Sequence, residues 1–399
     1  PHDCMIRLGK RVLAGFVATV VAAIIWVPCL HFFFAHRADD FHASTGLTTK
    51  ARALANRHLE IWRDLKLRDN ELKRMRASNA EWDFMGRSFL VWSLANLGLR
   101  DASGKAECLA TMDRIIEETL RLEAQEGMCF FLMPYAKQSK YVVQPARSLF
   151  LDGEIALMLA ARRVLEERAE YKTALAERVR LMSEGLRAAT NSVLESYPNE
   201  CWTFDHVLAL VAIRAADRLD GTDHSALISD WVAMARQNLV EPQSGMLVSS
   251  FTTRRQVKDG PEGSTLWMVC HCLQVLDEGF AREQYDRARA QLGEITLGFG
   301  YGHEWPRGQK GWADIDSGPI VPVFNISAGS SGMALIGASA FGDQKFLGAL
   351  ATTLDFAAFP SRRNGQLKYC ASNQVGDAAL LYAATLGPLW EKIKTTRAP

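Results

Sequence analysis

The chain has 399 residues, of which 48% are hydrophobic and 23% are charged, a composition that predicts a globular protein with one large core or two ordinary ones. Its 46 lysines and arginines nearly balance 45 aspartates and glutamates, so the net charge of +1 provides no field to attract nucleic acid, and we expect no such partner. The eight cysteines contain no C-x-x-C pair, so they indicate neither a zinc site nor a redox centre.

An apolar stretch near the start of the chain predicts a membrane span. The sequence VLAGFVATVVAAIIWVPCLHFFF at 12–34 is long enough to cross a hydrocarbon core. It ends in bulky residues and no good A-x-A site follows, which favours an uncleaved anchor over a cleaved signal. We predict a tail at 1–11, a transmembrane anchor at 12–35, a linker at 36–46 and one catalytic domain at 47–399.

The charges beside this stretch predict its orientation. Arg7, Lys10 and Arg11 lie close before it, whereas few basic residues follow it closely. The positive-inside rule therefore favours a single pass through an inner or plasma membrane, with the catalytic domain facing the periplasm or the outside.

Beyond the anchor the hydrophobic periodicity is helical. Very apolar segments, such as FDHVLALVAIRAADRL, alternate with amphipathic ones, such as HSALISDWVAMARQNL. Five such pairs, a helix at about 47–75 and a last helix from about Gln374 give about a dozen helices in hairpins. We therefore predict an all-α fold, an (α/α)6 barrel or six-hairpin toroid in which the apolar helices line the inside, preceded by one transmembrane helix.

Loop lengths predict where the site lies. Connections within a pair are short, and those between pairs are long. Such long loops in a compact domain are usually functional. Since short and long connections alternate, the long ones must gather on one rim of the ring. They lie at about 127–145, 192–203, 240–264, 297–325 and 358–374.

The stretch NAEWDFMGRSF at 79–89 brings polar residues to the start of the first inner helix. It carries Glu81 and Asp83, of which we take Asp83 as a catalytic candidate, and Trp82 and Arg87 as candidates for substrate binding. A structural interpretation stays open, in which Asp83 occupies the first helical turn and Arg87 pairs with a carboxylate of an outer helix.

Glu154 is the next catalytic candidate, in QPARSLFLDGEIAL. Its neighbours on the predicted helix are apolar or small, so a carboxyl group there costs free energy unless it is paired or protonated. Asp152 in the same stretch has the simpler interpretation of a satisfied buried acid.

The stretch YPNECWTFDHVLAL at 197–210 begins another inner helix at the end of a long connection. We expect Asp205 and His206 to point toward the cavity rim and to act in catalysis. Asp205 could equally be a negative charge at the helix N-terminus that the helix dipole stabilises. Three aromatic residues in or near these connections are candidates for substrate binding: Tyr141, Tyr197 and Trp202.

The segment FGYGHEWPRGQKGWADIDSGPIVPVFNIS at 299–327 adds further candidates. Asp314 and Asp316 are two residues apart, so both would face one side of an extended segment, and we take them as catalytic. A D-x-D pair without further oxygen ligands is a weak metal signal, so we expect no metal. Candidates for substrate binding here are His303, Trp305 and Trp312.

The segment DRLDGTD at 217–223 lies between an inner and an outer helix, and a W-x(n)-L-x-x-P-x-x-G pattern follows it from Trp231 to Gly245. In these motifs the chain resembles the linalool dehydratase/isomerase family over about 79–297. The resemblance implies an (α/α)6 barrel in an extracytoplasmic homo-oligomer that removes water from, or isomerises, a terpene alcohol without a cofactor.

The residues at the family's active-site positions differ in this chain. By position, the two family cysteines fall at Ser196 and Asp205, the histidine at Glu154, and the tyrosine near Met85, beside Asp83. The resemblance therefore implies acid–base chemistry by carboxylates in place of cysteine and histidine.

Three classes of function stay open. The first is a membrane-anchored lyase, hydratase or isomerase, in which Glu154 or Asp205 protonates the hydroxyl of a lipophilic small molecule and a neighbouring carboxylate or His206 removes a proton. The second is a glycoside hydrolase or polysaccharide lyase, since six-hairpin barrels commonly hold glycans in a cleft lined by carboxylates. The third is a non-catalytic binding protein on the same ring.

Overall fold

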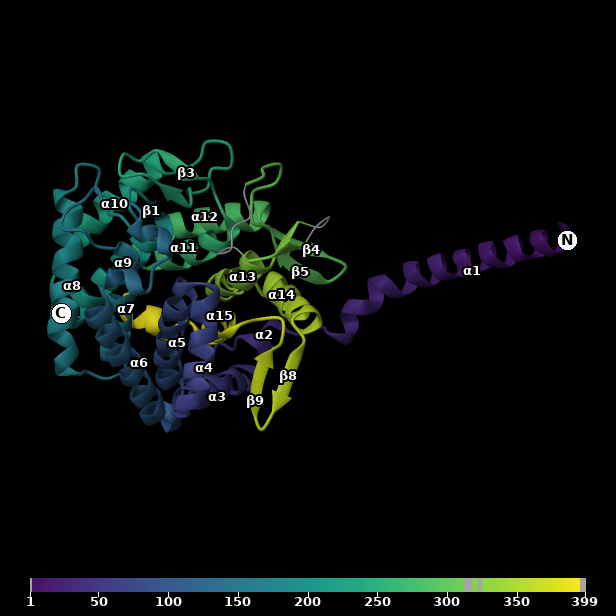
Figure 1. Cartoon of the computed structure of the whole chain (residues 1–399), viewed down its shortest axis with the longest axis horizontal. Coiled ribbons are helices and arrows are strands. Elements are labelled where there is room, and N and C mark those ends of the chain that lie inside the picture. The colour runs from purple at the N-terminus through teal and green to yellow at the C-terminus, as the bar shows by residue number, and fades with distance from the viewer. Residues whose placement is uncertain (1, 312–317, 322–324, 395–399) are drawn as a thin grey trace.

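The inner helices of the protein form a closed ring (Figure 1). The computed structural model describes residues 2–311, 318–321 and 325–394. Each inner helix contacts the next in chain order, and the last contacts the first, which confirms the predicted (α/α)6 barrel. Within the described residues the inner helices are α5 (Ala80–Arg100), α7 (Leu149–Leu165), α9 (Thr203–Asp220), α11 (Gly263–Leu276), α13 (Ala328–Phe341) and α15 (Gln374–Thr385).

A second layer of helices surrounds the ring. Inner helices such as α9 are buried on nearly all sides, whereas outer helices bury one face, as their alternation of charged and apolar residues predicts. The outer helices are α3 (Thr49–Arg63), α4 (Leu65–Ser78), α6 (Lys105–Glu126), α8 (Ala169–Ala188), α10 (Ser225–Asn238), α12 (Glu278–Gln291) and α14 (Gln344–Ala357), and the short α16 (Pro388–Lys394) follows α15.

The helix expected at about 47–75 is divided at Asp64 into α3 and α4. The carboxylate of Asp64 accepts hydrogen bonds from the backbone N–H groups of Lys66 and Leu67, at 2.9 and 3.0 Å. It therefore caps a new helix, because an N-terminal aspartate satisfies donors that have no partner within the helix.

The long connections contain short antiparallel strands that the helical periodicity does not predict. One sheet has the order β1-β2-β3, a second β4-β5-β7-β6, and a third pairs β8 with β9. The strands are β1 (Cys201–Trp202), β2 (Ser250–Phe251), β3 (Val257–Asp259), β4 (Gly293–Thr296), β5 (Phe299–Gly302), β6 (Ile320–Val321), β7 (Ile326–Ser327), β8 (Pro360–Arg363) and β9 (Gln366–Tyr369).

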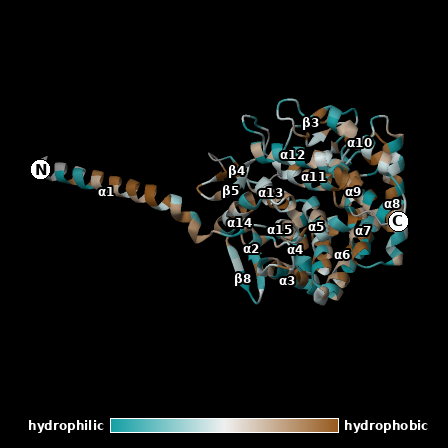
Figure 2. Ribbon diagram, turned by 180° about the vertical axis from the view of Figure 1, so that it is seen from behind, coloured by the Kyte–Doolittle hydropathy of each residue, from teal (hydrophilic) through white to brown (hydrophobic). Residues whose placement is uncertain are grey.

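The first helix, α1 (His2–Cys29), projects away from the barrel (Figures 1 and 2). With the 3-10 turn η1 (Leu30–Phe33) it forms a segment, Arg7–Phe33, that is long and apolar enough to cross a membrane, a property that a signal sequence shares. The segment 36–46, expected to be a linker, contains α2 (Ala38–Phe41), which contacts α14 and α3. Phe41 is fully buried, so α2 is part of the barrel's hydrophobic core.

The DRLDGTD segment forms a hydrogen-bonded turn between α9 and α10. The carboxylate of Asp217 accepts from the Thr222 hydroxyl at 2.7 Å, from the His224 backbone N–H at 2.9 Å and from His224 Nδ1 at 2.7 Å. Gly221 ends α9 with φ of 72°, a left-handed conformation that glycine adopts without steric cost.

We expect Asp217→Ala to lower the free energy of unfolding by about 2–3 kcal/mol, because it leaves three donors of the turn without their acceptor. Thermal unfolding of the full chain in detergent would measure the change. Asp230→Ala, on the exposed side of α10, is the matched control and should change stability by less than about 0.5 kcal/mol. Equal melting temperatures for the two variants would contradict this account of the turn.

Candidate functional site

A pocket lies where the N-terminal ends of the inner helices meet the long connections. It encloses about 130 Å³ and is partly open to solvent. Carboxylates and aromatic rings dominate its wall, as expected for the loop-rich rim. The residues that line it are Glu81, Trp82, Met85, Tyr135, Phe150, Tyr197, Trp202, Phe204, Asp205, Glu262, Ser264, Thr265 and Met333.

Asp205 is a pocket acid whose surroundings favour its protonated form. It lies in the first turn of α9 and is buried, and the Ser196 hydroxyl donates a hydrogen bond to its carboxylate. Burial raises the pKa of Asp205 to about 7, and the charge of Glu200 adds to the rise, while the Ser196 hydrogen bond opposes it. A substantial fraction of this carboxyl group is therefore protonated at neutral pH.

Two more carboxylates, Glu81 and Glu262, share the pocket wall with Asp205. Glu81 lies in the first turn of α5 and accepts a hydrogen bond from the Tyr197 hydroxyl. Glu262 immediately precedes α11, and its backbone N–H donates to the Ser249 hydroxyl at 3.1 Å. The three acids therefore come from three different inner-helix termini.

Aromatic side chains form much of the remaining wall. The rings of Tyr135 and Tyr197 stack with centroids 4.6 Å apart. Trp202 donates its indole N–H to Glu200 at 2.8 Å, and Glu200 also forms an ion pair with Lys258. These contacts hold the rings in fixed positions, where their faces can contact an apolar ligand surface.

Glu154 lies on α7 and is 1% exposed. Within the described part of the chain neither carboxylate oxygen has a hydrogen-bond partner, and the nearby Ser88 hydroxyl donates to the Phe84 carbonyl oxygen at 3.3 Å. Burial raises the pKa of Glu154 well above its usual value, and the charges of Asp205 and Glu81 add to the rise. Its environment thus favours the protonated form, and the charges of the pocket acids act on Glu154 although its side chain does not line the pocket.

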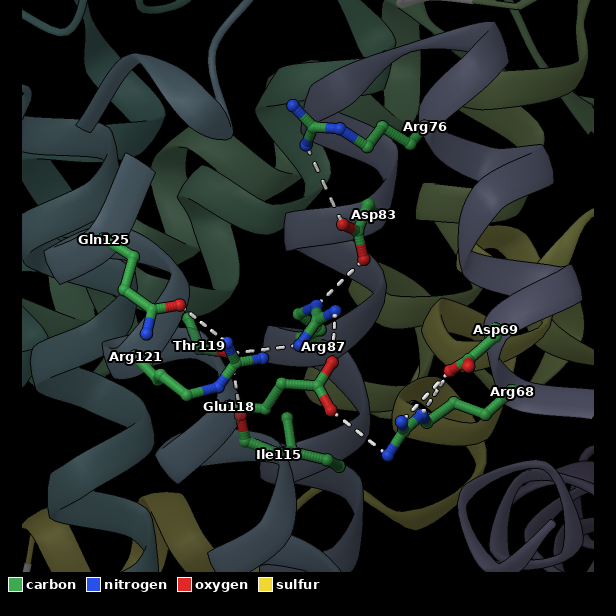
Figure 3. Close-up of polar contacts among 10 residues, drawn as sticks. All are labelled: Arg68, Asp69, Arg76, Asp83, Arg87, Ile115, Glu118, Thr119, Arg121 and Gln125. Atoms are coloured by element: carbon green, nitrogen blue, oxygen red, sulfur yellow. Dashed lines mark hydrogen bonds and ion pairs between the residues drawn. The ribbon is translucent and has the colours of Figure 1, made fainter. Parts of the chain in front are cut away.

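Asp83 and Arg87 do not line the pocket, in contrast to our expectation. Arg87 forms ion pairs with Asp83 at 2.8 Å and with Glu118 of the outer helix α6 at 3.0 Å (Figure 3). Arg76 on α4 lies 4.0 Å from Asp83. Both residues therefore connect α5 to the outer layer, as in the structural alternative considered for Arg87.

His206 also lies outside the pocket, although it is adjacent to Asp205 in sequence. Its Nδ1 lies 2.8 Å from the Trp202 carbonyl oxygen, and its Nε2 accepts from the Leu194 backbone N–H at 3.0 Å. The ring stacks on Trp231 of α10, and burial lowers its pKa to about 4. A neutral imidazole with its proton on Nδ1 satisfies both contacts, so this histidine has no nitrogen left for proton transfer.

The other predicted residues have varied positions. Trp82, Tyr197, Trp202 and Asp205 line the pocket, whereas Tyr141, His303 and Trp305 do not. Tyr141 donates to the Ser196 carbonyl oxygen at 3.2 Å, and His303 lies 2.9 Å from Glu294. Three predicted residues lie outside the described part of the chain: Trp312, Asp314 and Asp316.

Sequence reasoning missed Glu262 and Tyr135, and did not take Glu81 as a catalytic candidate. Glu262 precedes the apolar inner helix STLWMVCHCLQVL by one residue, Gly263, so it shares with Glu81 and Asp205 a position at an inner-helix start. This shared position is the signal that could have identified it. Tyr135 lies in the 3-10 turn η4 (Pro134–Lys137), inside a long connection without periodicity.

Comparison with known proteins leaves the activity open. No family model and no curated protein matches the sequence. Among solved structures, the selenomethionine derivative of a GH76 α-mannanase from Bacteroides thetaiotaomicron aligns with 75% of this chain and 85% of its own, with a TM-score of 0.47 and 9% sequence identity. Similarity at this level assigns no reaction, and no match supports the linalool dehydratase/isomerase family in particular.

We expect the stability of Asp205→Asn relative to the natural chain to depend on pH. The folded-state pKa of about 7 lies above the unfolded value of about 3.9, so folding is most favoured below pH 4 and loses free energy as pH rises toward 7. An uncharged asparagine avoids this loss. The variant should match the stability of the natural chain at pH 4 and be more stable by about 4 kcal/mol at pH 8, as measured by thermal unfolding.

The exposed Asp286 on α12 provides the matched control for this measurement. Asp286→Asn should leave the pH dependence of stability unchanged. A constant difference between Asp205→Asn and the natural chain from pH 4 to 8 would show that burial does not control the protonation of Asp205.

Arg87→Met should lower the free energy of unfolding by about 3–5 kcal/mol, because it leaves Asp83 buried without its nearest charge partner. Arg180→Met, which removes exposed ion pairs on α8, should change stability far less than Arg87→Met, because water screens exposed charges. Chemical denaturation measures both. A stable Arg87→Met protein with weakened ligand binding would instead assign Arg87 to the site.

Proposed function

We propose that the protein is an acid–base hydrolase that cleaves a glycosidic bond in the pocket formed by Glu81, Asp205 and Glu262. The observation that carries the proposal is the pairing of a carboxyl group that is partly protonated at neutral pH with other carboxylates in one pocket. Asp205 would supply the proton, and a second pocket carboxylate that stays ionised would accept one at the same pH.

Asp205 acts as the general acid in this proposal. It donates its proton to the glycosidic oxygen as the bond from that oxygen to the anomeric carbon breaks. Ser196 orients the carboxyl group through its hydrogen bond. Glu81 or Glu262 receives the proton of the attacking water, whose oxygen forms the new bond to the anomeric carbon.

The aromatic wall supports a sugar as the ligand. Trp82 and Trp202 line the pocket, and both side chains are partly exposed, so their faces are accessible from the opening. Indole rings cover the apolar face of a pyranose while the sugar hydroxyls remain available to carboxylates. A partly open pocket also admits one end of a longer glycan, which a closed cavity would not.

We further propose that α1 anchors the barrel to an inner or plasma membrane as an uncleaved single span. The length and apolarity of Arg7–Phe33 support this. The packing of Phe41 and Ala38 into the barrel just after the span also supports it, since the junction is part of the fold. The excess of basic residues before the span favours a barrel outside the cytoplasm.

A second candidate function is a carboxylate-based lyase or isomerase for a hydroxylated lipophilic molecule, of the linalool dehydratase/isomerase type. One observation favours it. Ser196 and Asp205, at the positions of the two family cysteines, are hydrogen-bonded, and Glu154, at the histidine position, is coupled to Asp205. Protonated Glu154 or Asp205 would then protonate the substrate hydroxyl, and a neighbouring carboxylate would take a proton from carbon.

We expect Asp205→Asn to reduce glycan cleavage at least about 100-fold, because the general acid is lost. Incubation of the full chain in detergent with a panel of oligosaccharides, followed by a reducing-end assay, measures it. Activity of the natural chain should fall as pH rises through about 7, where Asp205 loses its proton. Asp286→Asn should retain full activity.

The same proteins incubated with terpene alcohols, with products separated by gas chromatography, test the second candidate. Dehydration or isomerisation that is lost in Glu154→Gln, without any glycan cleavage, would replace the hydrolase proposal. Glycan cleavage that persists in Asp205→Asn would remove Asp205 from the mechanism.

A further inference from the structure

A group of exposed, large apolar side chains surrounds the point where α1 meets the barrel. We refer to Phe32, Phe33, Leu297, Phe356 and Phe359 as the apolar collar. Their exposed fractions are 68%, 72%, 48%, 40% and 67%, respectively. They come from η1, the β4–β5 hairpin, the end of α14 and the connection to β8, which are distant in the sequence.

Contacts between neighbouring residues hold these segments together. The ring of His31 lies against Gly298, at the tip of the β4–β5 hairpin. Phe356 contacts Phe34 and Phe299, each with ring centroids 5.1 Å apart. These contacts place η1, the β4–β5 hairpin and the end of α14 side by side at the root of α1 (Figure 2).

Two members of the collar have backbone conformations that bulky residues rarely adopt. Leu297 has φ of 50° and Phe359 has φ of 51°, in the left-handed region. Glycine or asparagine would fit such exposed turns with less strain and with better solvation. Two large apolar residues in strained, water-exposed positions are unfavourable for a surface that faces only water.

The length of α1 indicates what covers the collar. The segment Arg7–Phe33 has 27 residues and, at 1.5 Å per residue, extends about 40 Å. A hydrocarbon core is about 30 Å thick, so a segment that crosses it has its last residues in the headgroup layer. Phe32 and Phe33 end this segment, so the rest of the collar would lie at the same depth.

Charge in the segments that follow the collar residues agrees with a lipid surface. Arg362 and Arg363 follow Phe359 by three and four residues on β8, and both are exposed. Exposed Arg37 lies just after η1, beside Asp39, which partly offsets its charge. Arginines next to interfacial aromatic residues are typical of segments that lie in a headgroup layer.

We infer that the collar inserts into the interfacial layer of the membrane that α1 crosses, so that the barrel itself binds lipid at Leu297 and Phe359. The inference rests on the proposed anchor and is independent of the reaction in the pocket. Helix and collar then form two attachments that fix the tilt of the barrel relative to the membrane. The occupant of this surface is phospholipid rather than a second protein.

Photo-crosslinking in phospholipid nanodiscs tests the inference with the full chain. p-Benzoylphenylalanine is introduced at Leu297 or Phe359, and the discs contain phosphatidylcholine and phosphatidylglycerol. After irradiation, mass spectrometry measures lipid adducts. Val257 on β3, which is 56% exposed and lies away from α1 in Figures 1 and 2, is the matched control position.

We expect at least a 10-fold higher yield of lipid adducts at both collar positions than at Val257. Equal yields would overturn the inference even if the chain is embedded in the disc. Adducts between two protein chains would overturn it as well, since the collar would then be a protein interface. A chain that does not co-elute with the discs would refute both the anchor and the membrane insertion of the collar. Neither result would affect the proposed hydrolase activity, which is tested separately by the dependence of glycan cleavage on Asp205.

Discussion

Closure of the inner ring, from α5 around to α15 and back, is the constraint on which the rest of the structure depends. Each inner helix packs against two inner neighbours and the outer layer, so almost every side chain is removed from water. A polar group there must pair or lose its charge. Arg87 and Asp83 pair with each other, and His206 is held by backbone groups. Glu154 has no hydrogen-bond partner among the described residues, and burial shifts its pKa toward the protonated form.

The same constraint explains which parts could be predicted from sequence. Inner and outer helices differ so strongly in apolar content that the barrel follows from periodicity and loop lengths. The strands cannot be predicted in this way, because they are two to four residues long and depend on pairing across distant loops. From sequence alone, Asp64 cannot be told apart from an aspartate inside a helix. Only the hydrogen bonds that it accepts from the backbone of Lys66 and Leu67 show that a new helix starts there.

The candidate site was predicted in part, for a related reason. The long loops predicted the rim at which the pocket lies, and four of the predicted residues line it: Trp82, Tyr197, Trp202 and Asp205. However, a helix that is apolar on all faces has no stripe that defines its rotation. Successive residues differ by about 100° around its axis, so Asp205 faces the pocket while His206 faces α10. Whether Glu81 or Asp83 faces the pocket depends in the same way on the rotation of α5 about its axis, which the sequence does not define.

The burial of Phe41 has a consequence for how the protein can be divided. Although 36–46 has the length of a tether, α2 occupies a place in the core beside α3 and α14. A shortened chain that begins at residue 47 would leave a void where an aromatic ring belongs. We therefore expect a shortened barrel to need Ala38 and Phe41, because α2 fixes the segment after η1 against α3 and α14.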